Sequence, residues 1–158
     1  MKMSFWNKTI LISLYLIFHF FVISDVRTHV FEFQIREVQT YYSSPNSEIN
    51  IDRIHTRIID FDYPDKEKGT EKVWTYKIPF GFFFLLGILG LLTVGSNRKY
   101  YIVLLVTHLV VLLAGSLVFY LSINVNTWLL AINDLLTRYI NPMISIGVVA
   151  FALLEKRK

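Results

Sequence analysis

The stretch YYIVLLVTHLVVLLAGSLVFYLS, Tyr100–Ser122, decides the fold class of this chain. It is an apolar run that contains no Asp, Glu, Lys or Arg. A helix needs about 20 apolar residues to cross the hydrocarbon core of a bilayer. The stretch meets that requirement without help from its flanks, so it predicts a transmembrane helix.

Three more apolar segments lie on either side of it. They are TILISLYLIFHFFVIS (Thr9–Ser24), IPFGFFFLLGILGLLTVGS (Ile78–Ser96) and YINPMISIGVVAFALL (Tyr139–Leu154). The middle one of these is long enough to span a bilayer, whereas the other two would borrow a turn from their flanks. Because 54% of the 158 residues are hydrophobic and are gathered in such blocks, we expect an all-α integral membrane protein. It would form a single membrane domain over residues 1–158 with four transmembrane helices.

Composition excludes several kinds of function. The chain has no cysteine, which rules out disulfides, thiolate metal sites and cysteine nucleophiles. Its net charge is +4, but the basic residues stand at segment ends and form no stripe with interleaved aromatic residues. We therefore expect no nucleic-acid partner. The membrane segments leave no room for a soluble catalytic domain, so we also expect no enzyme activity, no cofactor and no metal.

The first apolar segment has two interpretations. Lys2 and Lys8 precede it, as basic residues precede the apolar part of a cleavable signal peptide. However, the segment lacks a small-x-small cleavage site and carries bulky residues such as Tyr15 and Phe21. This favours an uncleaved membrane anchor.

The short basic flanks predict the orientation. Lys2 and Lys8 precede the first segment, Arg98 and Lys99 separate the second from the third, and three basic residues follow the fourth. An even number of spans places these clusters on one side, which the positive-inside rule makes cytoplasmic. We expect a protein of the cytoplasmic (inner) membrane with both termini in the cytoplasm.

The outer side then holds a long loop, residues 25–77, and a shorter one, residues 123–138. Apolar residues in Val26–Tyr42 fit both a helical and a strand spacing. No Gly or Pro interrupts this run, so we prefer a helix that continues out of the membrane. Ile49–Phe61 has a second, weaker helical periodicity. The outer loop is therefore predicted to form a mostly helical cap.

Polar residues inside the apolar segments are the candidate site. His19 and His108 could be haem ligands, metal ligands or a proton relay, but they lie at different depths and no further ligand residues accompany them. We favour neutral imidazoles bonded to neighbouring groups. Gly115 lies among small residues that allow helices to approach closely. Packing within the bundle and docking to another membrane protein both remain open for this face.

A second group of polar residues lies in INDLLTRYINPMIS, residues 132–145. Asp134, Arg138, Asn141 and Ser145 recur with helical spacing on one face. The simplest arrangement is an outer interfacial helix, 127–138, that bends at Pro142 and enters the membrane. Asp134 and Arg138 would then pair, while Asn141 and Ser145 must bond inside the bundle or to a partner.

This segment also resembles a known family. Arg138-Tyr139, followed by Asn141 and Ser145, is similar to the last helix of the small exosortase-associated membrane proteins, which are encoded beside exosortase-type transpeptidases. The resemblance implies an accessory subunit of a protein-sorting system. It does not imply the transpeptidase itself, since that enzyme needs a Cys nucleophile and this chain has none.

An intramembrane enzyme is a third possibility, but the apolar segments lack a paired acid and base. Two other functions are therefore favoured. The first is a non-enzymatic accessory or assembly subunit, embedded in membrane lipid and docked to another integral membrane protein. The alternative is a small transporter or channel that works as an oligomer. The alternative requires polar groups from several helices to converge on one path, and His19, His108, Arg138 and Asn141 are its candidates.

Overall fold

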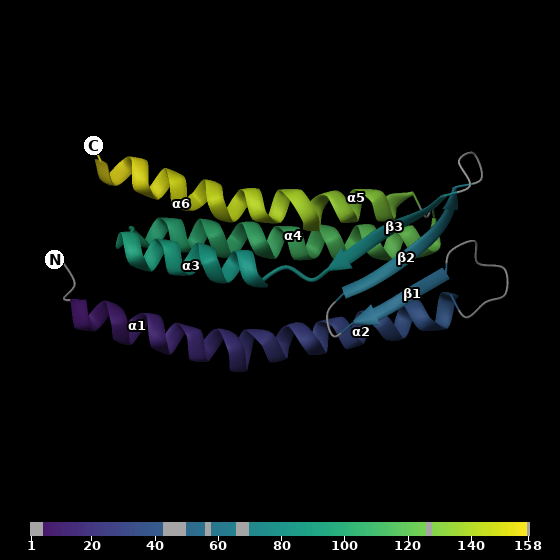
Figure 1. Cartoon of the computed structure of the whole chain (residues 1–158), viewed down its shortest axis with the longest axis horizontal. Coiled ribbons are helices and arrows are strands. Elements are labelled where there is room, and N and C mark those ends of the chain that lie inside the picture. The colour runs from purple at the N-terminus through teal and green to yellow at the C-terminus, as the bar shows by residue number, and fades with distance from the viewer. Residues whose placement is uncertain (1–4, 43–49, 56–57, 66–69, 126–127, 158) are drawn as a thin grey trace.

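Long, nearly parallel helices form the body of the molecule, and a small sheet lies at one end (Figure 1). The structure is a computed structural model that describes residues 5–42, 50–55, 58–65, 70–125 and 128–157. The helical elements and strands are, in chain order, α1 (Phe5–Phe18), η1 (His19–Ile23), α2 (Ser24–Tyr42), β1 (Asn50–His55), β2 (Ile58–Asp65), β3 (Thr70–Lys77), α3 (Phe82–Val94), α4 (Arg98–Asn124), α5 (Leu129–Leu135), η2 (Leu136–Ile140) and α6 (Asn141–Arg157). The elements η1 and η2 are single π-helical turns inside longer helices.

Three helices of the described chain are long and apolar enough to cross a membrane. They span Phe5–Gln34, Arg98–Ser122 and Leu129–Arg157, and a shorter apolar helix, Phe82–Val94, accompanies them. This places the chain among multi-pass membrane proteins. The first and last spans are longer than the apolar segments predicted for them, because helical backbone continues into their polar flanks. The predicted helix over Val26–Tyr42 is confirmed as α2, which continues α1 without a break.

The predicted helix over residues 127–138 continues into the last membrane segment, as expected from the sequence. In the described residues the helix begins at Leu129 and runs through η2 into α6 as one rod (Figure 1); Thr127 lies outside them. Pro142 explains the π-helical turn just before it. A proline in a helix has no N–H to donate and clashes with the carbonyl one turn earlier. The wider turn at Leu136–Ile140 makes room for that carbonyl while the helix axis continues.

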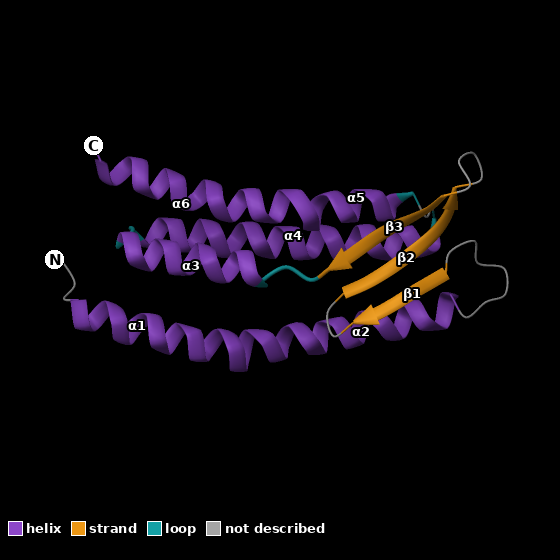
Figure 2. Ribbon diagram, in the orientation of Figure 1, coloured by secondary structure: helices purple, strands orange, loops and turns teal. Residues whose placement is uncertain are grey.

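The all-α prediction is wrong for the outer loop. Residues of the predicted helix over Ile49–Phe61 form β1 and the first part of β2 instead, and β3 completes an antiparallel sheet in the order β1-β2-β3 (Figure 2). The segment Ile59–Tyr63 alternates apolar and acidic residues, a spacing of two that suits a strand. A continuous register from Ile58↔Lys77 to Asp65↔Thr70 then pairs β2 with β3. The segment Ile49–Phe61 does have a helical periodicity, but the pairing of the strands determines the structure that its described residues adopt.

The core of the helical body lies between α3, α4 and α6. Phe84, Leu91, Leu104 and Ala152 form its buried cluster. Gly87 permits this packing, because a Cβ there would lie 2.9 Å from a Leu104 methyl group.

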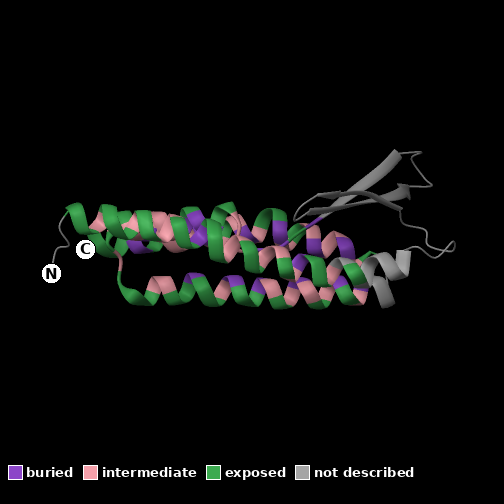
Figure 3. Ribbon diagram, turned by 90° about the horizontal axis from the view of Figure 1, so that it is seen from below, coloured by how far each residue is buried: buried purple, intermediate pink, exposed green. Residues whose placement is uncertain are grey.

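We call the long helix Phe5–Gln34 the first rod and the long helix Leu129–Arg157 the last rod. The first rod packs far less tightly on the rest of the bundle. In the most apolar 18 residues of this helix only 6% are buried, against 28% in the same stretch of each of the other two spans. Figure 3 colours the exposed residues green.

Candidate functional site

A polar seam joins α4 to the last rod. The members from α4 are His108 and Gly115, and the members from the last rod are Asn133, Thr137, Asn141 and Ser145. All of them are buried. The structure therefore brings together four of the residues singled out from the sequence: His108, Gly115, Asn141 and Ser145. It adds Asn133 and Thr137, two further polar residues of the stretch 132–145.

His108 is fully buried and bonded at both ring nitrogens. Its Nδ1 lies 2.8 Å from the carbonyl oxygen of Leu104. A carbonyl only accepts, so Nδ1 carries the hydrogen and Nε2 of the neutral ring is an acceptor. The hydroxyl of Ser145 lies 3.2 Å from Nε2 and donates to it. The Phe80 and Phe84 rings pack around the imidazole.

This arrangement matches the interpretation of His108 as a bonded neutral imidazole. An ionised imidazole among phenyl rings in lipid would be costly. The described residues contain no group of three His, Asp or Glu side chains that could hold a metal ion. The seam thus offers His108 a hydrogen-bond partner at each ring nitrogen.

Asn133 connects the same two helices nearer to the sheet end of α4. Its Nδ2 donates to the carbonyl oxygen of Gly115 at 3.3 Å. A Cβ on Gly115 would lie 3.4 Å from Asn133 Oδ1, an ordinary van der Waals distance, so α4 and the last rod are in contact at this point. In the described structure the Oδ1 atoms of Asn133 and Asn141 are buried without a hydrogen-bond partner.

The π-helical turn η2 determines which polar residues face α4. Asn133, Thr137, Asn141 and Ser145 are four residues apart, a spacing that drifts around a regular helix of 3.6 residues per turn. The wider turn at Leu136–Ile140 offsets that drift. The predicted face containing Asp134 and Arg138 is consequently divided. These two residues pair with each other at 3.1 Å, and the side chain of Arg138 is 46% exposed.

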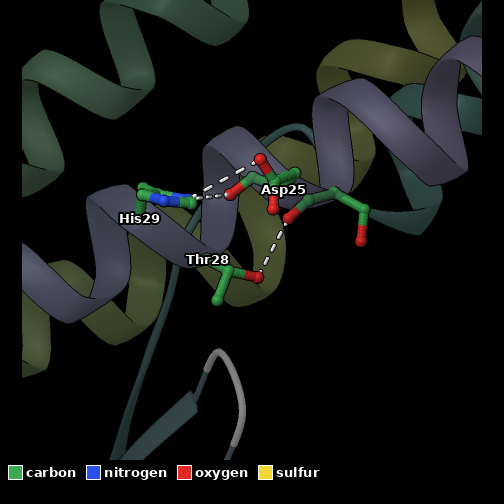
Figure 4. A network of polar contacts seen from close by, with 4 residues as sticks. Asp25, Thr28 and His29 are labelled. Atoms are coloured by element: carbon green, nitrogen blue, oxygen red, sulfur yellow. Dashed lines mark hydrogen bonds and ion pairs between the residues drawn. The ribbon is translucent and has the colours of Figure 1, made fainter.

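His19 lies in the other long rod. It is buried in the π-helical turn η1, and its Nδ1 is 3.5 Å from the hydroxyl of Tyr15 one turn earlier. Further along that rod, Figure 4 shows polar contacts that also stay within one helix. Thr28 donates to the carbonyl of Ser24 at 3.0 Å, and His29 contacts the carbonyl of Asp25 at the same distance. These contacts join residues on neighbouring turns of α2.

A second cluster, which we call the outer junction, joins three elements through Gln34, Tyr76, Ser116 and Phe119. The Tyr76 hydroxyl donates to Gln34 Oε1 at 2.6 Å, and Gln34 Nε2 donates to the Ser116 hydroxyl at 2.8 Å. The rings of Tyr76 and Phe119 stack with centroids 4.5 Å apart. Burial raises the pKa of Tyr76 to about 12. The junction thus holds α2, β3 and α4 together. Its residues are 42 and 82 positions apart in the sequence, so no local pattern predicts their contact.

The segment between β3 and α3 is held by Arg27 of α2. Its Nη2 donates to the carbonyl of Ile78 at 2.9 Å and its Nε donates to that of Pro79 at 3.0 Å. Phe80 follows with φ of 66°, a left-handed conformation that costs energy in a residue with a side chain. Arg27 and the packing of Phe80 on Phe84 hold this conformation in place.

Comparison with known proteins assigns no family to this arrangement. No family model, no curated protein and no solved structure matches the chain.

Proposed function

We propose that this chain is a four-span protein of the cytoplasmic membrane that acts as a non-enzymatic accessory or assembly subunit and docks to another integral membrane protein. The fourth span would be α3, whose 13 residues are extended by its flanks. Both termini would be cytoplasmic. The partner suggested by the Arg138-Tyr139, Asn141 and Ser145 pattern is an exosortase-type transpeptidase of a protein-sorting system.

The orientation is supported by where the basic residues lie. We call the end of the bundle that carries the turn after α3 the Gly95 end. Lys8 of α1 donates to the Thr93 carbonyl there, Lys156 of α6 donates to the Val94 carbonyl, and Lys99 pairs with Glu155. Basic residues from three distant segments thus lie together, as the positive-inside rule requires of a cytoplasmic face.

The observation that carries the docking proposal is the poor packing of the first rod. Helix α1 has no buried residue of its own. Its large apolar side chains are mostly exposed, among them Ile10, Leu14 and Ile17. Lipid covers any such surface, but a rod this loosely attached to its own bundle is also free to pack against a foreign helix. Van der Waals packing is the force that drives such association in membranes.

Site-specific crosslinking tests this proposal. A photo-crosslinking amino acid at Leu14 of α1 is compared with one at Val110 of α4, since both side chains are close to 57% exposed. The chain is expressed together with an exosortase-type transpeptidase. We expect a crosslink to that protein from Leu14 and lipid adducts alone from Val110. Equal protein crosslinking from both positions, or from neither, would count against a docking face on α1.

The transporter alternative draws on the polar seam, where two buried amide oxygens have no partner in the described structure. Against it, His108, Ser145 and Thr137 already have partners within the chain. A transporter further predicts that Arg138→Ala abolishes solute flux in proteoliposomes while the oligomer stays intact. Unchanged flux in that variant removes Arg138 from any transport path.

A further inference from the structure

Two ammonium groups from opposite ends of the chain meet at the Gly95 end. The Nζ atoms of Lys8 and Lys156 donate to adjacent carbonyls, those of Thr93 and Val94. They lie 3.8 and 3.7 Å from the position that a Cβ would occupy on Gly95, so the two cations are neighbours. Gly95 itself ends α3 in the left-handed conformation, which directs the last carbonyls of the helix toward these cations.

The two ammonium groups have unused capacity to bind an anion. In the described part of the chain neither Lys8 nor Lys156 forms an ion pair, and the nearby acid, Glu155, is already paired with Lys99 at 2.5 Å. Each ammonium has three donors and gives one to a carbonyl. Ser96, which lines a small pocket together with Lys156, has a buried hydroxyl without a partner in the described structure.

An apolar groove of about 320 Å³ runs between α3 and α6. Phe83, Leu86 and Gly87 line it from α3, and Ile146, Val149, Ala150 and Leu153 are among the residues that line it from α6. The same face of α6 continues one turn beyond Leu153 to Lys156 and Arg157, because residues three and four apart share a helix face. The groove therefore points toward the pair of lysines at the Gly95 end.

We propose that this surface binds an anionic phospholipid, with the phosphate between Lys8 and Lys156 and an acyl chain in the groove between α3 and α6. Charge complementarity selects this occupant. An apolar helix in the groove would leave the two cations without an anion, and a zwitterionic lipid brings its own ammonium group to them. The inference rests on the membrane-spanning arrangement and is independent of docking to a partner protein.

The test uses the full chain in mild detergent and measures lipid retention by native mass spectrometry. Phosphatidylglycerol and phosphatidylcholine with the same acyl chains are titrated against each variant. We expect Lys8→Gln and Lys156→Gln each to weaken phosphatidylglycerol binding about fivefold, which is close to the contribution of one basic residue near an anionic headgroup. Lys156→Arg keeps the charge and should keep the binding. Arg98→Gln removes one charge at the same end and should change it less than twofold, by about the effect of diffuse charge alone.

The groove has its own pair of variants. Ala150→Phe fills the groove without changing charge and should weaken binding of phosphatidylglycerol, whereas Val110→Phe on the exposed face of α4 should not. Inorganic phosphate at millimolar concentration should not displace the lipid. The proposal fails if phosphatidylcholine binds as tightly, if Arg98→Gln weakens binding as much as Lys156→Gln, or if Ala150→Phe has no effect. Displacement by inorganic phosphate would assign the lysines to a free anion and would equally overturn it.

Discussion

The hydroxyl of Ser145 lies 3.2 Å from Nε2 of His108 and joins α6 to α4 through two side chains that are almost completely buried. Nδ1 of His108 donates to the Leu104 carbonyl, so Nε2 of the neutral ring is an acceptor. The Ser145 hydroxyl supplies the hydrogen that this acceptor needs. The other hydrogen bonds that the described structure shows in the polar seam run from a side chain to a backbone carbonyl.

Removing the Ser145 hydroxyl should therefore destabilise the bundle. Ser145→Ala leaves Nε2 of His108 buried without a donor, and an unsatisfied buried polar group costs about 1–3 kcal/mol. The buried Ser122 offers a control, because its hydroxyl donates to the Phe119 carbonyl within α4. We expect a lower midpoint of thermal unfolding in detergent for Ser145→Ala than for Ser122→Ala. Equal midpoints would mean that the bond between the helices contributes nothing to stability.

The glycines of α3 and α6 should respond differently to substitution. A Cβ on Gly90 would lie 3.0 Å from both methyl groups of Val149, whereas a Cβ on Gly147 would have nothing within 4 Å. Gly90→Val should therefore separate α3 from α6 and lower the unfolding midpoint. Gly147→Ala should leave it unchanged or raise it, since Ala is favoured over Gly in a helix by about 1 kcal/mol. Destabilisation by both substitutions to the same degree would contradict the packing described for α3 and α6.

How much of this structure the sequence predicts depends on whether a pattern is local. The long apolar run at Tyr100–Ser122 and the uninterrupted run at Val26–Tyr42 both correspond to helices, because main-chain hydrogen bonds in a helix are local. Ile49–Phe61 has a weak helical periodicity, and the pairing of β1 with β2 and of β2 with β3 overrides it. The position of Asn133 on the same face as Ser145 could not be predicted for a related reason. It depends on the π-helical turn Leu136–Ile140, and Pro142 is the one sequence feature that indicates such a turn.

The outer junction should make stability depend on pH in the alkaline range. The pKa of Tyr76 rises from 10.0 to about 12 because the phenol is buried. A group whose pKa is raised by folding contributes its full stabilisation below the unfolded pKa and loses it as pH passes through the folded one. We expect the wild-type chain to lose stability between about pH 10 and pH 12 by this ionisation. Tyr76→Phe should lack that part of the loss.

The same variant isolates the hydroxyl from the ring. Tyr76→Phe keeps the stacking on Phe119 but removes the bond to Gln34 Oε1. At neutral pH we expect a loss of roughly 0.5–1.5 kcal/mol, the usual net contribution of one such bond. Tyr139→Phe, at an exposed position, is the control. Hydrogen exchange should increase in β3 for Tyr76→Phe alone, and unchanged exchange there would show that the junction does not hold the sheet.

The orientation can be tested cleanly because the chain has no cysteine of its own. Asn97→Cys places a thiol in the turn at the Gly95 end, and Lys77→Cys places one at the end of β3; both positions are exposed. The lysines gathered around the α3 carbonyls predict that the Gly95 end is cytoplasmic. A membrane-impermeant maleimide should label Lys77→Cys in intact cells and should label Asn97→Cys only after permeabilisation. The reverse pattern would invert the protein in the membrane. It would also place Lys8 and Lys156 at the outer leaflet.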